Sequence, residues 1–181
     1  MVRIIKSTQR GITGTFAELT IDRIREHLRK PFTPVQVDFS DDNWTRGKVP
    51  SVPGWYYLTT DAPLTALVDA KLWTQEFSRN TQIDIRAARF CEVSAAIWNK
   101  EIVYNGFHKN LKGRAKEHTF GHQLTGTLAL HRYDALKEYN WKFSFLTMDD
   151  LSVPPASRDM VLRFGELLWR ADNRWPLLCM E

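Results

Sequence analysis

The chain has 181 residues, of which 43% are hydrophobic and 25% are charged, a composition typical of a folded globular protein and not of a disordered chain. Its formal net charge of +4 and its isoelectric point of about 9.1 favour an anionic partner without identifying one. Cys91 and Cys179 form no CxxC or Cys/His cluster, which argues against a zinc site. No secretory signal or apolar run of membrane-spanning length appears, so we expect a soluble, cytoplasmic protein with reduced thiols and no membrane contact.

The N-terminal third, residues 1–52, is predicted to be an extension made of a strand, a helix and a linker. Thr15-Phe16-Ala17-Glu18 fits a capping box, and apolar residues then recur at helical spacing until Lys30-Pro31 ends the helix. Arginines on its other face are more typical of a solvated surface than of DNA contact. Four prolines between 31 and 53 indicate a connecting segment, with a short strand at 35–37.

Strands and helices both follow, so we predict an α+β fold in which a small, mainly antiparallel central sheet is flanked by helices. In the first strand, Trp55 and Tyr57 are expected to face one side of the sheet, and Tyr56 and Leu58 the other. Apolar patterning predicts strands at 54–60, 89–98, 101–107 and 141–146, and helices at 61–73, after 110 and at 157–171, with a helix-rich piece at 119–139.

The stretch from Tyr104 to His118 carries the clearest chemistry. Tyr104 lies near the end of a predicted strand, a basic loop follows, and Arg114 and His118 are then four residues apart on one face of a helix. An arginine can form two hydrogen bonds with phosphate oxygens, while tyrosine and histidine can transfer protons. The same spacing also fits a hairpin followed by a solvated basic helix.

Glu166 lies in the last predicted helix, with apolar Leu162 and Trp169 on the preceding and following turns. A carboxylate in such a place needs a partner, and a divalent cation is one. The other possible partner is Arg170 at i+4, and by spacing alone an ion pair of this kind is the more common arrangement.

These pieces resemble the signature of the GIY-YIG nuclease superfamily over about residues 53–178. Tyr104-Asn105-Gly106, Asn110-Leu111, Arg114 and His118 resemble its second half, Gly54-Trp55-Tyr56 resembles its first half, and Glu166 resembles its metal-binding glutamate. The resemblance implies a nuclease domain at 53–181 with an insertion at about 61–90. It also implies a metal-dependent DNA endonuclease that hydrolyses phosphodiester bonds with Mg²⁺ or another divalent cation such as Mn²⁺.

The resemblance implies a role for each matched residue. Tyr56 and Tyr104 would transfer protons and position water, Arg114 would bind phosphate, His118 would act as a base or orient the others, and Glu166 would bind the metal. Because a phenol with a pKa near 10 is a poor base, an adjacent cation such as the Arg114 side chain or a metal would have to favour the phenolate. We expect the nucleic acid to contact Lys109, Asn110, Lys112 and Lys116, with Asn110 also capping the helix.

The sequence departs from the family pattern in four places. Residues 57–103 separate the two half-motifs, so strand 89–98 could take the first-motif place and leave Tyr56 outside the site. The other departures are a polar residue inside Tyr-x-Gly, a glycine within the Arg114 helix and a cysteine where the family often carries a late asparagine (Asn105, Gly113, Cys179). These differences leave two alternatives: an inactive nucleic-acid-binding module and a protein-interaction domain. If the chain cleaves both strands in concert, it would act as a homodimer.

Overall fold

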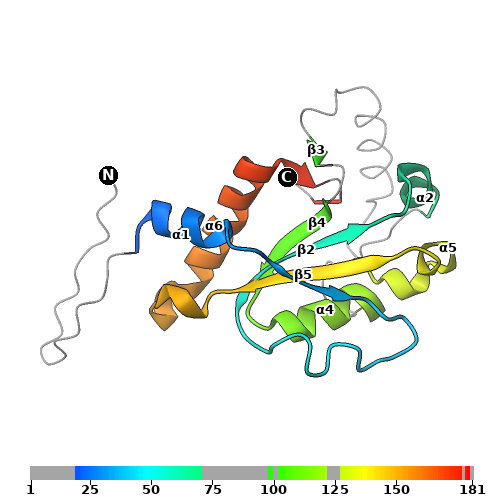
Figure 1. Ribbon diagram of the computed structural model, residues 1–181, viewed down its shortest axis with the longest axis horizontal. Helices are drawn as coiled ribbons and strands as arrows, with labels where there is room; N and C mark the ends of the chain where they lie inside the picture. Colours follow the sequence, from blue (N-terminus) through cyan, green and yellow to red (C-terminus); the bar gives the residue numbers. More distant parts are fainter. Residues whose placement is uncertain (1–18, 71–97, 100–101, 122–126, 177, 180–181) are drawn as a thin grey trace, which may run out of the picture.

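In the computed structural model, the described residues are 19–70, 98–99, 102–121, 127–176 and 178–179 (Figure 1). They contain helices and strands in mixed order, with three single 3₁₀ turns (η1–η3) between the later ones. The elements are α1 (Ile21–Leu28), β1 (Thr33–Gln36), β2 (Gly54–Thr60), α2 (Leu64–Asp69), β3 (Trp98–Asn99), β4 (Ile102–His108), α4 (Leu111–Phe120), η1 (Leu130–Arg132), α5 (Asp134–Lys137), β5 (Trp141–Thr147), η2 (Asp149–Leu151), η3 (Pro155–Ser157), α6 (Arg158–Asn173) and β6 (Trp175–Pro176).

The main sheet has the strand order β1-β5-β2-β4, and every neighbouring pair is antiparallel. This arrangement confirms the predicted α+β fold with an antiparallel sheet between helices. β2 lies in the interior of the sheet, where Tyr56 is opposite Gly106 of β4 on one side and Phe145 of β5 on the other. β3 and β6 form a separate short parallel pair.

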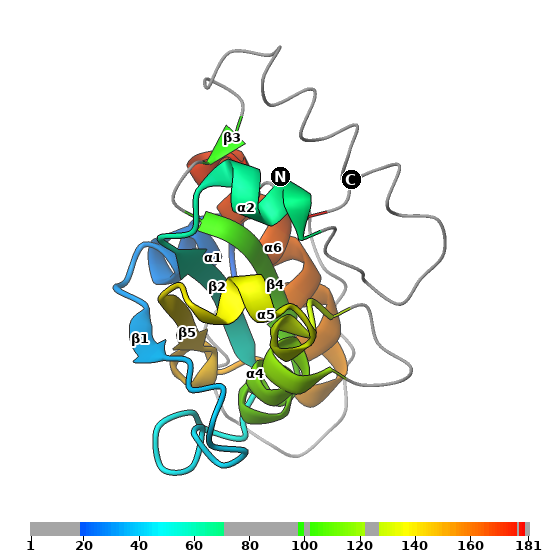
Figure 2. The same ribbon diagram turned by 90° about the vertical axis from the view of Figure 1, so that its right-hand side faces the viewer.

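The alternation of β2 divides the core into two layers, as the sequence predicted. Tyr56 and Leu58 pack with buried side chains of α4 and α5 on one face, whereas Trp55 and Tyr57 pack with α1 and α6 on the other (Figures 1 and 2). Each face of the sheet therefore has its own hydrophobic cluster, and β2 contributes to both.

The N-terminal segment is part of this architecture where it is described. β1 pairs with β5 and forms one edge of the sheet. It overlaps the strand predicted at 35–37 but begins two residues earlier, at Thr33. α1 begins later than the sequence indicated: Thr20 has an extended backbone, and its hydroxyl accepts a hydrogen bond from the Arg23 amide at 3.2 Å. Thr20 therefore caps the helix, and the capping box expected at 15–18 lies outside the described residues.

Two other expectations about helices were wrong. The stretch 119–139 is not a long helical piece: α4 ends before Gly121, whose φ of 87° is left-handed, and only η1 and the four-residue α5 follow in the described part. In α6 the apolar face is narrower than predicted, because Met160 and Leu167 are each 53% exposed. α2 covers only part of 61–73, and residues 71–97, with most of the expected 89–98 strand, lie outside the described residues.

None of the helices in the described ranges has both the length and the apolar character needed to cross a bilayer.

α6 packs against β2 through an unusually close contact. The indole nitrogen of Trp55 donates to the Leu162 carbonyl at 2.9 Å, and a Cβ added at Gly165 would lie 2.5 Å from that nitrogen. Only a glycine at position 165 lets helix and strand approach this closely.

We expect Gly165→Ala to destabilise the protein by about 1–3 kcal/mol because its methyl group would overlap the Trp55 ring. In an unconstrained helix the same substitution stabilises by about 1 kcal/mol, so the sign of the effect is diagnostic. Urea denaturation of both proteins measures it. A free energy of unfolding equal to or above that of the parent would contradict the packing described here.

Candidate active site

The site is built around the hydroxyl group of Tyr56, which is buried in the middle of β2. Its oxygen lies 2.8 Å from Nε2 of His118 and accepts a hydrogen bond of 3.0 Å from Nε of Arg114. Gly106 faces it from β4, and a Cβ at that position would come within 2.6 Å of the hydroxyl oxygen. The glycine of the Tyr-x-Gly motif therefore leaves the space that the Tyr56 hydroxyl occupies.

α4 delivers Arg114 and His118 to this hydroxyl from one helix face. Asn110 caps the helix, as predicted, by accepting a hydrogen bond of 3.0 Å from the Gly113 amide. The first turn is also fixed to the loop before β2, because the Leu111 amide donates to the Val52 carbonyl at 3.1 Å. The direction of α4 relative to β2 is thus set by backbone hydrogen bonds as well as by the buried Leu111.

The hydrogen bonds of His118 determine its tautomer. The backbone amide of Leu128, which can only donate, lies 3.3 Å from Nδ1, so Nδ1 is the acceptor. Burial lowers the pKa of His118 well below 6.5, with Arg114 and His108 acting in the same direction, so the ring is neutral. A neutral ring with an accepting Nδ1 carries its proton on Nε2 and donates it to the Tyr56 oxygen.

The Tyr56 oxygen accordingly accepts from both Arg114 and His118, which leaves its own proton to be donated elsewhere. Burial raises its pKa well above 10, and the nearby Arg114 guanidinium only partly offsets this. Arg114 does act in favour of the phenolate, as the sequence reasoning required of an adjacent cation, but desolvation outweighs it, so Tyr56 is a neutral phenol in this structure.

Tyr104 joins the cluster through its ring, which lies 4.7 Å from the His118 ring and 6.2 Å from the Tyr56 ring between centroids. Its pKa is also raised, mainly by burial. Arg114 is held from its other side by Glu117, whose Oε2 lies 2.9 Å from Nη1. Burial lowers the pKa of Arg114, but its polar neighbours outweigh this and raise it, so the guanidinium keeps its charge.

Glu166 reaches the neighbourhood of this cluster from α6. Its Oε1 forms an ion pair with Nη2 of Arg170, which is the i+4 alternative that the spacing favoured. Burial raises the pKa of Glu166, while Arg170, Arg163 and Arg114 act to lower it. Arg114 is one of the charges that lower the pKa of Glu166, whereas Glu166 forms its ion pair with Arg170 on its own helix.

Sequence reasoning missed the network that holds Arg170. Its Nε donates to Oδ1 of Asn105 at 2.8 Å, and its guanidinium lies 4.6 Å from the centre of the Trp175 ring. The Cys179 sulfur lies 3.2 Å from the same Asn105 oxygen. Two departures from the family motif, Asn105 and Cys179, are therefore in contact with each other. A polar residue facing inward from β4 was the only sequence signal of this network.

The pairing of β2 with β4 bears on which strand carries the first half-motif. In the described residues β4 pairs with β2, and Tyr56 of β2 contacts Arg114 and His118. The competing segment, 89–98, is described only at its last residue, which belongs to β3. The geometry thus brings Tyr56 together with the residues of the second half-motif.

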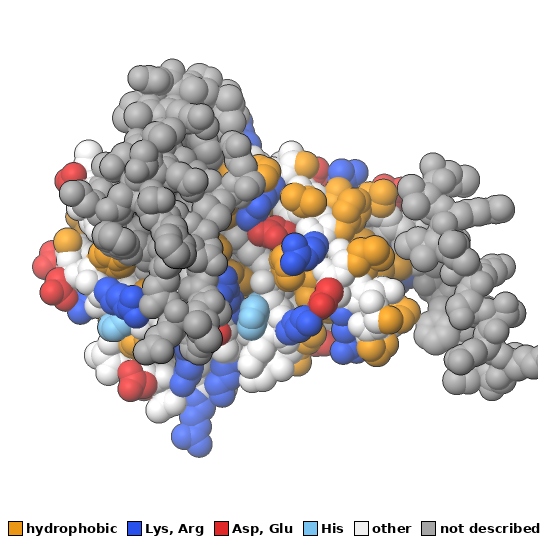
Figure 3. All heavy atoms as spheres, turned by 180° about the vertical axis from the view of Figure 1, so that it is seen from behind, with side chains coloured by type: hydrophobic (Ala, Val, Ile, Leu, Met, Phe, Trp, Pro, Cys, Tyr) orange, Lys and Arg blue, Asp and Glu red, His pale blue; other side chains and the backbone are white. Residues whose placement is uncertain are grey.

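The predicted nucleic-acid contacts lie at the surface beside α4. Lys109 is paired with Asp159, with 2.9 Å between nitrogen and oxygen, and Lys116 donates to Oδ1 of Asn43 at 3.3 Å. Lys112 is half-buried on the first turn of α4. In Figure 3 Lys and Arg side chains are spread over the described surface with acidic and hydrophobic ones among them. The described part of the face seen in this view is mixed in character and does not by itself define a binding face.

A divalent cation would have to rely on Glu166. The described part of the chain holds no group of three or more His, Cys, Asp or Glu side chains that could bind a metal ion. Oε2 of Glu166 accepts no hydrogen bond from any described residue, since Arg170 contacts Oε1. Mg²⁺ commonly keeps several waters and binds through one or two carboxylates and substrate phosphates, so this single open oxygen fits the ion.

We predict that His118→Gln makes stability less sensitive to acid. Below pH 6.5 the unfolded chain protonates His118 while the native ring stays neutral, so the native state loses stability as pH falls. Replacing His118 removes the part of this acid-induced loss of stability that His118 causes. The loss that remains includes the contribution of His27, whose pKa is also lowered by burial. Urea denaturation at pH 7.5, 6.5 and 5.5 measures the slope. Identical slopes for parent and variant would contradict a neutral, buried His118.

Comparisons with protein-family models, with curated proteins and with solved structures found no match at the thresholds applied. The likeness to GIY-YIG nucleases accordingly depends on the quoted residues alone. The geometry does not depend on that likeness: Tyr56, Arg114 and His118 are joined by hydrogen bonds, the Tyr104 ring is stacked with the Tyr56 ring, and Arg114 acts on the pKa of Glu166.

Proposed function

We propose that the chain is a metal-dependent endonuclease that hydrolyses phosphodiester bonds in DNA. The observation that carries this proposal is the Tyr56 oxygen, which accepts hydrogen bonds from Arg114 and from the neutral His118. Phosphodiester hydrolysis is accelerated by a group that transfers a proton to a reacting oxygen and by a cation that stabilises charge on the phosphate. The site offers both within hydrogen-bonding distance of one another.

Tyr56 is the proton-transferring group in this proposal. Because two donors hold its oxygen, its own proton is directed to a third group, which would be the leaving oxygen of the phosphodiester, while the attacking water would lose its proton to the surrounding solvent. The same two donors would stabilise the phenolate once the proton has left. His118 orients Tyr56 and donates to its oxygen, so its role here is positioning, while Tyr104 packs against the His118 ring.

Arg114 would bind the scissile phosphate. It remains charged, and Tyr56 and Glu117 fix its orientation, so the cost of ordering the guanidinium is largely met before substrate binds. Glu166 would hold Mg²⁺ through Oε2, and the ion would stabilise charge on the leaving oxygen. The DNA backbone would contact four residues on and beside the first turns of α4: Lys109, Asn110, Lys112 and Lys116. The protein would act in the cytoplasm. Cleavage of both strands in concert would require a homodimer.

One observation favours a second candidate, a nucleic-acid-binding module that does not cleave. The ion pair between Arg170 and Glu166 occupies one oxygen of the proposed metal ligand and places a positive charge beside it. A cation at Glu166 must be bound despite that charge, which lowers its affinity. If the pair persists when DNA and Mg²⁺ are present, the chain would bind nucleic acid without hydrolysing it.

Cleavage of supercoiled plasmid with Mg²⁺, beside an EDTA control, distinguishes the two. We expect the parent to nick DNA only with the metal, and Arg114→Ala and Glu166→Gln to lose at least about 100-fold in rate, since each removes charge stabilisation from the transition state. Arg23→Ala on α1 and Glu138→Gln at the end of α5, which change residues outside the proposed site and its DNA contacts, are matched controls and should cleave at the parental rate.

Unchanged rates in the Arg114 and Glu166 variants would contradict the assignment of the site. Absence of cleavage by the parent, combined with DNA binding that weakens steeply with salt, would support the non-cleaving module instead. If the parent neither cleaves nor binds DNA, both candidates fail.

A further inference from the structure

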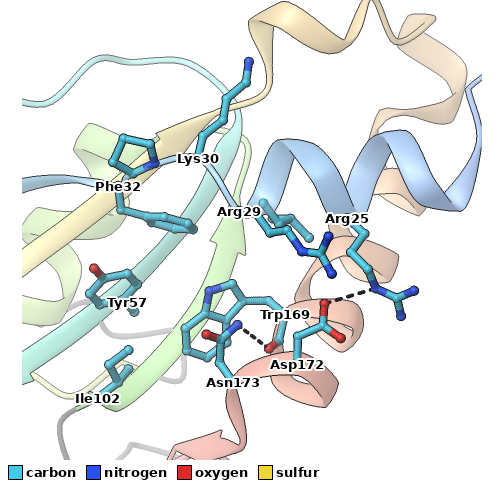
Figure 4. Close-up of a pocket in the computed structure, with 11 residues that line it drawn as sticks. Arg25, Arg29, Lys30, Phe32, Tyr57, Ile102, Trp169, Asp172 and Asn173 are labelled. Carbon is cyan, nitrogen blue, oxygen red and sulfur yellow. Dashed lines mark hydrogen bonds and ion pairs between the residues drawn. The ribbon is translucent and has the colours of Figure 1, made fainter.

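A pocket of about 620 Å³ lies among α1, β2, β4 and the end of α6, where Tyr57 rather than Tyr56 contributes from β2 (Figure 4). Neighbouring residues of a strand face opposite sides of the sheet, so this pocket and the candidate active site are on different faces. Its volume is within the range typical of sites for small molecules. None of the five proposed catalytic residues lines it.

Three aromatic rings form one wall of the pocket. The ring of Phe32 lies 4.9 Å from that of Tyr57, and Tyr57 lies 5.9 Å from Trp169 with 28° between their planes. Phe32 and Tyr57 are half-buried, so part of each ring is accessible. Figure 4 shows the nitrogen-bearing edge of Trp169 on the side of Phe32 and Tyr57, and no described residue accepts a hydrogen bond from that nitrogen. The wall is suited to a planar ligand with a hydrogen-bond acceptor.

The rest of the lining is positively charged. It contains three cations and one carboxylate, Arg25, Arg29, Lys30 and Asp172. Arg25 is paired with Asp172 at 3.0 Å, and Lys30 points away from the rings toward Asp150. Arg29 differs, because its exposed guanidinium forms no hydrogen bond or ion pair with any residue the structure describes. A ligand phosphate could therefore form two hydrogen bonds with Arg29 without displacing a protein carboxylate from it.

We propose that this pocket binds one nucleotide unit, with the base against Phe32, Tyr57 and Trp169 and the phosphate on Arg29. A planar aromatic group joined to an anion is the chemistry that matches an aromatic wall beside an unpaired arginine. The unit has two sources of the same chemistry: a free nucleoside monophosphate or a residue of a single-stranded nucleic acid. The proposal does not depend on nuclease activity, because the pocket shares no residue with the candidate active site.

Calorimetric titration with adenosine monophosphate tests the pocket, with adenosine and ribose 5-phosphate as fragments that lack the phosphate or the base. We expect the nucleotide to bind at least about tenfold more tightly than either fragment, since each fragment loses one of the two contacts. A short oligoadenylate binding more tightly than the mononucleotide assigns the pocket to single strands, and equal or weaker binding assigns it to free nucleotide. No binding of either nucleotide or oligonucleotide overturns the proposal.

Variants locate the binding. Arg29→Glu should weaken nucleotide binding about tenfold or more, while Arg158→Glu, the same charge change at the exposed far end of α6, should have little effect. Phe32→Leu should weaken adenosine binding as well, because it removes a stacking surface, and circular dichroism checks that each variant is folded. Equal losses in Arg29→Glu and Arg158→Glu, or loss of binding in Arg114→Ala, would overturn the proposal by assigning binding to net charge or to the candidate active site.

Discussion

A phenol buried in the centre of an antiparallel sheet must find hydrogen-bonding partners, and the organisation of this molecule follows from how Tyr56 finds them. Arg114 and His118 approach its oxygen from α4, and Gly106 on the neighbouring strand leaves room for it. This requires α4 to start at a fixed place and direction, which the Asn110 cap and the backbone bonds to the preceding loop supply. The chemistry of the site and the docking of the helix are thus one set of contacts.

The second constraint arises at the β4 edge of the sheet, where Leu178 and Cys179 hydrogen-bond to the β4 backbone. β4 is the last strand, so α4 on one face and α6 on the other can bring side chains together around its edge. Glu166 comes to the site by this route, and Arg170 accompanies it, anchored by Asn105 and by the ring of Trp175. The carboxylate has one oxygen in an ion pair and one without a described partner. The proposed nuclease requires a cation at the second oxygen of Glu166, whereas a module that only binds nucleic acid does not.

Sequence reasoning succeeded where a feature depends on local spacing. The alternation of β2, the shared helix face of Arg114 and His118, and the Asn110 cap all follow from periods of two and 3.6 residues and from helix-end chemistry. It was less successful where long-range contacts decide. The pKa of Tyr56 depends on burial by residues distant in the chain, the Asn105 network joins β4 to α6 and to Cys179, and the nucleotide pocket combines four elements. The spacing of Glu166 and Arg170 did indicate their ion pair, but not what holds the arginine in place.

The measurement that tests the central claim most directly is a double-mutant cycle on single-turnover DNA cleavage, with Tyr56→Phe, Arg114→Lys and the combined variant. Because Arg114 Nε donates to the oxygen that Tyr56→Phe removes, the two residues should act as one unit, and the combined loss should fall well short of the product of the single losses. Fully multiplicative losses would show that the residues act independently. That result, or a parent protein that does not cleave, would contradict a catalytic role for the Tyr56 hydroxyl and its two donors.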